Sequence, residues 1–467
     1  MTGLSGFNTA VSGLSAAQRA IEVTAQNIAN ANTPGYSRQQ VQLSSVGTTT
    51  AAHVYTGGNA AILGGVNIDA VLRVRDTFLE TARVNAGSTK AALDIRASTL
   101  SGVESLMHEP GDDGLQAVVD DFYASWHELA ASPGTNQATA GGQVLQRANA
   151  LVAQLKFVAS GVEEQWNNAQ GDLTTSVAEL NQATSDLALV NQRLMEGTVA
   201  ERPINELLDR RDTLIRKIGD LAGGRGTINK NNTVTMMIDN VTVVSGSRAL
   251  PITLAGGTSL ADAPSDPPVL MSGVIGAPVS NGKIAGLLAS LGGDLPTAAA
   301  QVDSVAVALR DAVNTVHSTG YTLTGSTGLD FFAGTGASDL SVVPTTSDDL
   351  AVASAPNVVD GTNAEAIADL ALDDRAESVL GGPGPSVQLR AMAADIGTKL
   401  QGLQRAADVQ DSVFATADAA VNSDSGVSID EEMTSLLMYQ RSYQASARVI
   451  TTVDDILDTL INRMAAH

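Results

Sequence analysis

The two ends of the chain share one spacing of apolar residues, and this spacing limits the folds that the chain can adopt. Near the N-terminus, side chains at alternating steps of three and four residues are apolar over about four heptads, which predicts a helix with a seam for a partner helix. A cluster of turn-forming residues then ends the helix at 30–35. This N-terminal seam, with the motif that follows it, comprises Leu4, Phe7, Val11, Leu14, Ile21, Asn27, Ile28, Asn30, Pro34, Gly35 and Tyr36.

The C-terminal end repeats this spacing in a helix that we expect from Asp430 to Met464. Just before it, Ser428 and Glu431 have the spacing of a capping box. A second apolar row, from Val449 to Leu460, lies beside the first, and a helix with two apolar rows usually has neighbours on two sides. The C-terminal seam comprises Met433, Leu436, Gln440, Tyr443, Ala447, Ile450, Leu457 and Ile461.

The two seams have two interpretations. A two-helix hairpin within one chain would use one seam on each terminal helix, but it would leave the second C-terminal row uncovered and would have little core of its own. Packing between copies of the chain would cover both rows. The sequence therefore favours assembly through the terminal helices.

The interior of the chain predicts further helices with a β segment among them. Apolar residues at helical spacing indicate helices at 115–129, 144–194, 204–221, 295–316 and 389–421. Between residues 223 and 282 the spacing changes to two, and Asp239-Asn240 offers a hairpin turn. The predicted fold is mainly α with a small β insertion. It is a nested, elongated, multidomain chain with terminal coiled-coil helices, a long-helix bundle and an outer β domain.

The domain boundaries follow from this nesting. We expect a terminal helical domain at 1–45 and 428–467, a helical bundle domain at 46–222 and 283–427, and a small β outer domain at 223–282. Because loop closure depends only weakly on loop length, the sequence predicts that a short linker could replace the β domain without unfolding the bundle.

Charge and residue content exclude several classes of function. The chain has 27 Lys and Arg against 50 Asp and Glu, a formal net charge of −23, so nucleic acids and anionic membranes are unsuitable partners. It has no cysteine, which excludes thiolate metal sites and cysteine nucleophiles. No apolar run reaches the ~18 residues of a membrane span, and the N-terminus lacks the pattern of a secretory signal.

Catalytic and metal-binding motifs give only weak matches. A glycine-rich stretch at 276–284 has five residues between its glycines where a phosphate-binding loop needs four. His108-Glu109 and His127-Glu128 lack the second histidine of a zinc protease helix. An acidic run at 422–432 lacks an oxygen ligand at the first position of a calcium loop. We therefore expect no catalytic residue, no metal site and no cofactor.

Longer motifs at both ends resemble those of one protein group. The run at 13–39, which contains Asn-Ile-Ala-Asn-Ala-Asn-Thr-Pro-Gly-Tyr-Ser-Arg-Gln, resembles the N-terminal signature of bacterial flagellar rod, hook and hook-associated proteins. The segment 428–450, which contains Tyr-Gln-Arg-Ser-Tyr-Gln, resembles their C-terminal signature. Within the group, residues 33–39, 205–212 and 314–332 resemble the hook-associated protein 1 family, the hook–filament junction proteins, more than rod or hook proteins.

This resemblance implies a structural subunit without catalytic activity. The terminal helices would form the inner tube of the flagellar axial structure, and the subunits would form a ring that joins hook to filament. The implied partners are further copies of the chain, the hook protein, a second junction protein on the filament side, and a cytoplasmic export chaperone on the C-terminal helix. Export through the flagellar type III apparatus would place the protein outside the cell.

Three alternatives remain open at this point. A hook or rod subunit belongs to the same class, but such subunits usually pass quickly from the N-terminal helix into glycine-rich β segments, whereas residues 116–226 here read as helix with short breaks. An extracellular enzyme carried on a flagellar scaffold would need a catalytic constellation, and none was found. A coiled-coil adhesin would not need the paired signatures at the two ends.

Overall fold

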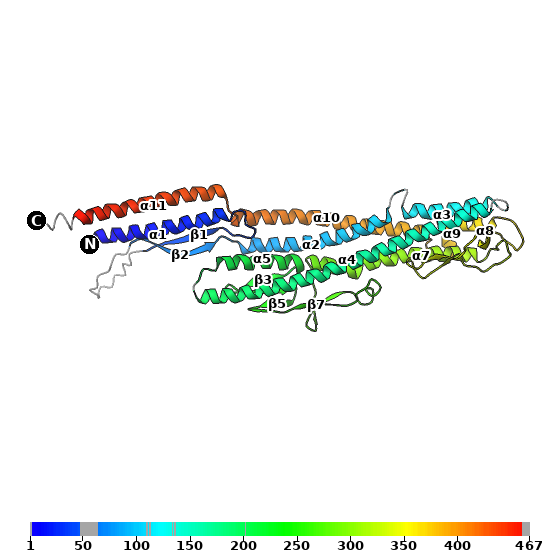
Figure 1. Ribbon diagram of the computed structural model, residues 1–467, viewed down its shortest axis with the longest axis horizontal. Coiled ribbons are helices and arrows are strands. Elements are labelled where there is room, and N and C mark those ends of the chain that lie inside the picture. The colour runs from blue at the N-terminus through cyan, green and yellow to red at the C-terminus, as the bar shows by residue number, and fades with distance from the viewer. Residues whose placement is uncertain are drawn as a thin grey trace.

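The computed structural model describes residues 2–46, 64–108, 111, 114–132, 134, 137–200 and 202–459, and it describes side chains from residue 6 onward. The molecule is elongated, and both ends of the chain lie at one tip (Figure 1). Two helices form this tip, a pair of long helices leads away from it, and a helical bundle with strands along one edge forms the rest. The mainly α fold class predicted from the sequence is confirmed.

The tip consists of the two terminal helices and a β ribbon. α1 (Thr2–Ala29) and α11 (Ile429–Asp458) lie side by side, and we call this pair the terminal hairpin (Figure 1). β1 (Gln39–Ser45) pairs antiparallel with β2 (Val66–Arg73), and both strands contact α1. The sequence predicted the helices but not the ribbon, because β1 has only two apolar residues and so gives a weak strand signal. The alternation of Val66, Ile68, Ala70 and Leu72 in β2 was the available signal.

Two long helices connect the terminal hairpin to the bundle. α2 (Thr77–Met107) and α10 (Pro385–Ser425) run side by side (Figure 1). The sequence predicted α10 but not α2. Because α2 contacts α10, α4, α5 and a further short helix on different sides, its apolar residues are spread around the helix instead of forming one stripe.

One very long helix organises the bundle. α4 (Gln137–Val199) has 63 residues, and α3 (Leu115–Ala130), α5 (Asn205–Ala222) and α7 (Leu295–His317) pack against it. α6 (Lys283–Ala289) and the π-helical turn η1 (Ser290–Asp294) lead into α7. Side chains with no exposed surface recur along α4 from Val144 through Leu180 to Leu194. The bundle therefore has a complete core within one chain.

The β insertion forms two small antiparallel sheets. In the first sheet the strands follow in chain order: β3 (Arg225–Ile228), β4 (Val234–Ile238), β5 (Val241–Ser245) and β6 (Arg248–Ala249). The second contains β7 (Ile252–Ala255), β8 (Val269–Ser272) and β9 (Ile275–Gly276). The predicted turn at Asp239-Asn240 joins β4 to β5, and Asp239 has a positive φ of 45°.

Two asparagines of α4 fasten this insertion to the bundle. The Asn191 amide donates to the backbone oxygens of Val234 and Gly246, both at 2.8 Å, and accepts from Val234 N at 2.9 Å. Asn181 binds both backbone groups of Ile252 in the same manner, at 2.7 and 2.8 Å. The buried side chains of β4 belong to the same apolar core as those of α4. The insertion is thus packed into the bundle, which argues against the expectation that a linker could replace it without loss.

The two ends of the insertion lie close together. Gly223 and Gly282 both have positive φ, at 66° and 87°. A Cβ on Gly282 would lie 2.6 Å from the backbone nitrogen of Ala222, and one on Gly223 would lie 2.8 Å from the Cβ of Asn281. Only glycine allows this close approach of the two strands of chain.

The far end of the molecule holds most of the buried aromatic residues. It contains β10 (Phe332–Ala333), β11 (Ser341–Val342), η2 (Ser347–Asp349), α8 (Thr362–Ala368), η3 (Asp369–Ala371) and α9 (Asp373–Leu380). Phe122, Trp126, Phe331 and Phe332 pack together here, and the His317 ring joins them. The rest of the core consists mainly of Ala, Val, Leu and Ile, and this aromatic cluster is the exception.

Candidate assembly site

Small residues hold the terminal hairpin together. Ala10, Ala17 and Ala20 are buried on α1, and a Cβ on Gly13 would lie 3.2 Å from the Ser446 Oγ of α11. The two helices of one chain therefore approach closely through a stripe of small side chains. This stripe is adjacent to the predicted N-terminal seam and is not the seam itself.

The predicted N-terminal seam lies at the edge of this contact. Phe7, Leu14, Ile21 and Ile28 are half-buried, and Val11 is exposed. The side chain of Leu4 lies outside the described residues. Larger apolar side chains than those in the contact thus remain partly open to solvent on α1. Their role in assembly stays a prediction.

α11 exposes apolar side chains along most of its length. Glu432 is its only buried residue among those described. Within the predicted C-terminal seam, Met433 is 45% exposed, Tyr443 and Gln440 are exposed, and four further members are half-buried, namely Leu436, Ala447, Ile450 and Leu457. Ile461 lies outside the described residues. Leu437, Met438, Val449 and Ile456 are also exposed. Of the second apolar row expected beside the seam, Val449 and Ile456 are thus exposed, Val453 is half-buried, and Leu460 lies outside the described residues.

A polar joint fixes the base of the terminal hairpin, and Asn27 is its centre. Asn27 is buried, and its Nδ2 donates to the backbone oxygen of Gln39 at 2.9 Å and to Glu432 Oε2 at 3.0 Å. Its Oδ1 accepts from the backbone nitrogen of Gln39 at 3.0 Å and from the Tyr36 hydroxyl at 2.8 Å. All four hydrogen-bonding positions of the amide are filled, so Asn27 joins α1, the following strand and α11.

Arg38 makes the second link between the ends of the chain. Its Nε donates to Glu432 Oε1 at 2.7 Å, and its Nη1 lies 3.2 Å from Glu431 Oε2. The predicted capping box is wrong: Ser428 is the N-cap residue of α11 but makes no side-chain cap hydrogen bond, and Glu431 pairs with Arg38 instead. At the start of α11, the ion pair between Arg38 and Glu431 thus takes the place of the predicted capping box.

The turn after α1 fits against α5. Asn30 donates from Nδ2 to the Gln26 backbone oxygen at 3.0 Å, which closes the helix end, and Pro34 is exposed. Gly35 has a φ of 83°, and a Cβ there would lie 2.6 Å from the Thr213 Oγ1 of α5. The glycine is therefore required both by the backbone conformation and by the close contact.

Below the joint, arginines surround one buried carboxylate. Asp212 of α5 is 1% exposed and accepts from Arg73 at 2.6 Å, from Arg211 at 2.8 Å and from Arg75. Arg73 also lies 2.8 Å from Asp209 and 3.2 Å from the Ser37 Oγ. Arg75 also lies 3.2 Å from Glu80, so three arginines face three carboxylates in this arginine cluster, which allows their burial.

Burial shifts the pKa values of this region without removing the charges. Desolvation lowers the pKa of Arg75 and that of Arg211 to about 10, so both guanidiniums stay protonated at neutral pH. Burial, helped by the charges of Asp209 and Glu432, raises the pKa of Tyr36 to about 12. Its hydroxyl therefore remains a hydrogen-bond donor to Asn27. Arg75, Arg211 and Tyr36 thus keep their protons at neutral pH, and with them the hydrogen bonds that they donate.

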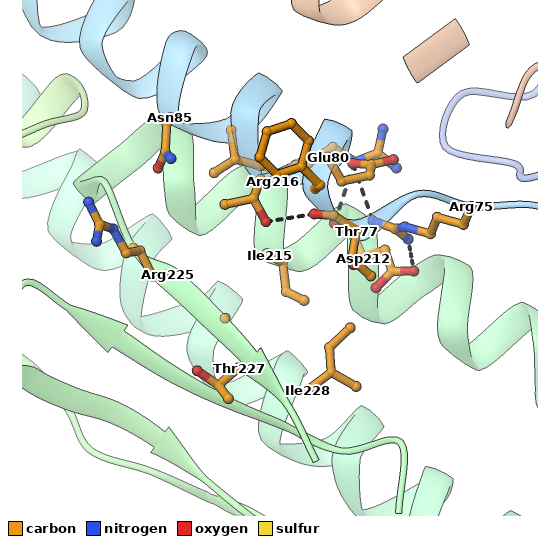
Figure 2. A pocket seen from close by; sticks show the side chains of 15 residues that line it. Arg75, Thr77, Glu80, Asn85, Asp212, Ile215, Arg216, Arg225, Thr227 and Ile228 are labelled. Atoms are coloured by element: carbon orange, nitrogen blue, oxygen red, sulfur yellow. Dashed lines mark hydrogen bonds and ion pairs between the residues drawn. The ribbon is translucent and has the colours of Figure 1, made fainter. Parts of the chain in front are cut away.

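Beside the arginine cluster, a groove of about 470 Å³ opens between α2, α5 and β3 (Figure 2). Arg75, Glu80 and Asp212 lie together toward one end (Figure 2). Phe78, which is 77% exposed, and Ile228 line it with apolar surface. We call this the waist groove.

The sequence identified only part of this site. The structure brings together Asn27 and Tyr36 from the predicted N-terminal motif. Glu432, Arg73 and Arg75 were missed. The segment 205–212, noted only for its resemblance, supplies Asp209 and Asp212. Arginine and aspartate residues close to apolar stretches could have indicated buried ion pairs. Nothing in the sequence showed which of these residues would pair with one another.

Neither metal-binding nor membrane-spanning features occur in the described ranges. No group of three or more His, Asp or Glu side chains there is placed to hold a metal ion. Across the same residues, no helix is both long and apolar enough to cross a membrane.

Family models match three parts of the chain. Residues 100–332 match the model described as the flagellar hook-associated protein FlgK helical domain. Residues 420–464 match the flagellar basal body rod FlgEFG protein C-terminal model, and residues 7–36 match the flagella basal body rod protein model. The two rod models thus cover the terminal hairpin, and the helical-domain model covers the bundle.

Relatives match over nearly the whole chain. Flagellar hook-associated protein 1 of Bacillus subtilis is 28% identical, with 98% of each chain covered. The proteins of the same name from Salmonella typhimurium and Escherichia coli are 25% and 24% identical, over 98% of this chain and 99% of theirs. The fold is similar to that of the flagellar hook junction protein FlgK from Burkholderia pseudomallei. That match has a TM-score of 0.63 at 13% identity, over 73% of this chain and 99% of the other.

Proposed function

The chain belongs to the flagellar hook-associated protein 1 family, and from this premise we propose how it works as a structural subunit of the bacterial flagellum. Copies of the chain form a ring between the hook and the filament, and the terminal helices polymerise in its inner layer. The subunit is non-catalytic.

One observation carries this proposal: the terminal hairpin is fixed at its base but left open along its sides. Asn27 and Arg38 tie α1 and α11 into one unit. Beyond this joint, α11 presents exposed apolar side chains that no described part of the same chain covers. Exposed apolar surface of this extent marks an interaction site. Neighbouring copies supply the cover.

The helical bundle favours a junction protein over a hook or rod subunit. The helical-domain model for the hook-associated protein matches residues 100–332, between the two rod-type ends. An enzyme on a flagellar scaffold is less well supported, because the charged side chains of the arginine cluster are engaged with one another.

The partners follow from the same position in the flagellum. The subunit binds the hook protein on one side and a second junction protein on the filament side. Before assembly, a cytoplasmic export chaperone covers the exposed apolar face of α11. The flagellar type III apparatus then exports the chain to its place outside the cell.

Electron microscopy of a strain that lacks this gene tests the proposal. We expect intact hooks without filaments, because filament growth needs the junction. A complementing gene with Met433→Asp should fail to restore filaments, since it places a carboxylate in the seam. Leu189→Asp on α4 is the matched control, because Leu189 is 46% exposed and Met433 is 45% exposed. Normal filaments without the gene, or equal behaviour of both variants, would contradict the proposal.

A further inference from the structure

The waist groove presents apolar surface that its own chain leaves open. Phe78 at the start of α2 is 77% exposed, and Ile228 of β3 is 43% exposed. β3 is an edge strand, since it pairs only with β4 among the described strands, and all four of its residues are exposed. Arg216 and Arg225 also line the groove, and Arg225 lies toward the end away from Ile228 (Figure 2). A ligand for this groove would therefore combine apolar side chains with negative charge.

A second uncovered face with complementary properties lies on α10. Val409 and Val413 are 65% and 49% exposed and, four residues apart, lie on the same side of the helix. Ser412 and Thr416 beside them are small, so another surface can come close. Residues 401–425 carry four aspartates against one arginine. Asp408, next to Val409, forms no ion pair with any residue that the structure describes.

These two faces belong to different elements of one copy, since the valines lie on α10 and the groove lies between α2, α5 and β3. α10 packs on α2, α2 on α5, and α5 on β3. Figure 1 shows α10 along one edge of the molecule and β3 toward the other. A contact between two different faces is heterologous and joins one copy to the next in the same orientation, and such contacts form a ring when the rotation between copies closes.

We propose that the Val409–Val413 face of α10 in one copy docks into the waist groove of the next copy. This inference rests on the proposed function, because it assigns a second contact to the same ring. The two valines cover Phe78 and Ile228, and Asp408 meets Arg225.

Electrostatics favours a second copy as the occupant. At a net charge of −23, copies of this chain repel one another on average, so a lateral contact needs a local region of opposite charge. Arg225 supplies such a charge, since it forms no ion pair with any other described residue. The contact also lies next to the terminal hairpin along the chain, because α10 leads into α11 and β2 leads into α2. It therefore extends the interface proposed for the hairpin.

The absence of cysteine makes a direct test possible, because introduced cysteines are the only thiols. Full-length protein carrying both Ile228→Cys and Val409→Cys is assembled on cells that lack the native gene, and isolated flagella are oxidised with copper–phenanthroline. We expect a ladder of dimers and higher oligomers on a denaturing gel, since each copy would bond to two neighbours. Each single variant should give no ladder.

Val274→Cys with Val409→Cys is the matched control, because Val274 is 93% exposed but lies outside the groove. A ladder from the groove pair and none from the control pair supports the proposal. Filaments that form without a ladder would overturn it and would leave the proposed function standing. A cross-link from Ile228→Cys to a protein of different mass would also overturn it, because another partner would then occupy the groove.

Charge reversal gives an independent readout if the cysteine pair does not assemble. Arg225→Asp or Asp408→Arg alone should lower the number of filaments per cell about tenfold. The double variant restores the opposite charges and should recover most filaments. If the double variant is no better than the worse single variant, the contact is not formed by these residues and the inference fails.

Discussion

The helical bundle and the terminal hairpin are both built from long helices, yet they differ in how completely one chain covers them. Along α4, Leu151, Leu155 and Val162 have no exposed surface. Along the described part of α11, only Glu432 is buried. Apolar spacing in a sequence therefore predicts a helix equally well in both regions, but it does not tell whether the partner belongs to the same chain.

The means of stabilisation differ as well. The bundle is held by burial of large apolar side chains, which is worth ~1.5–3 kcal/mol for each Val, Leu or Ile fully buried. The terminal hairpin relies on small residues along its length and on hydrogen bonds and ion pairs at its base. Its helices have few large buried side chains, so they are expected to open locally while the bundle stays folded.

Removal of the β insertion should give the largest loss of stability. We expect replacement of residues 223–281 by a Gly/Ser linker to lower the free energy of unfolding by about 5 kcal/mol or more. The replacement removes the buried side chains of β4 and also exposes the apolar surface of α4 on which they pack. Denaturant unfolding followed by circular dichroism measures this. An unchanged unfolding midpoint would show that the insertion is independent of the bundle, as the sequence alone suggested.

A cavity in the bundle should be almost as costly. Leu180→Ala is expected to lower the free energy of unfolding by about 3–5 kcal/mol, since Leu180 has no exposed surface on α4. Leu189→Ala, on the exposed side of the same helix, should change it by less than ~0.5 kcal/mol. Similar values for the two variants would mean that α4 is not the centre of the core.

The joint should show an intermediate effect, confined to the terminal hairpin. Asn27→Ala leaves Glu432 and the Tyr36 hydroxyl without a shared partner, at a local cost of about 2–3 kcal/mol. Faster hydrogen exchange in α1 and α11, with bundle exchange unchanged, is the expected result. Asn30→Ala is the matched control, because Asn30 serves only the exposed turn. Equal hydrogen exchange in α1 and α11 for both variants would show that Asn27 does not hold the two helices together.

Substitutions in the seam should have the smallest effect on the isolated subunit. Leu436→Asp and Ile450→Asp are expected to shift bundle melting by an amount within error, since no described residue of α11 belongs to the bundle core. The same variants should abolish assembly, because a carboxylate in a packed seam costs several kcal/mol. A large drop in the bundle melting temperature would place α11 in the core of the monomer.

Sequence reasoning worked where one physical signal dominated. The helices of the bundle and both terminal helices were predictable, because each has apolar residues at helical spacing. α2 was missed because it has neighbours on several sides, which dilutes any single stripe. The ribbon was missed because β1 has only two apolar residues, although apolar residues alternate along β2.

The polar joint was only half predictable, for a different reason. The N-terminal motif pointed to Asn27 and Tyr36, but Glu432, which accepts a hydrogen bond from Asn27, lies 405 residues away from it in the sequence. Pairing between distant charged residues leaves no local pattern. The small-residue stripe of α1 was hidden in the same manner, since Ala10, Ala17 and Ala20 form a contact only once α11 lies beside them.

Hydrogen exchange of the full-length protein, first as a proven monomer and then in isolated flagella, tests the central claim most directly. The claim is that the bundle is complete in one chain, whereas the terminal hairpin is completed by neighbouring copies. In the monomer we expect strong protection in α4 and α7 and weak protection in α1 and α11. In the assembled flagellum, protection of α1 and α11 should rise to that of the bundle. Terminal helices that are as protected in the monomer as α4 would contradict the account.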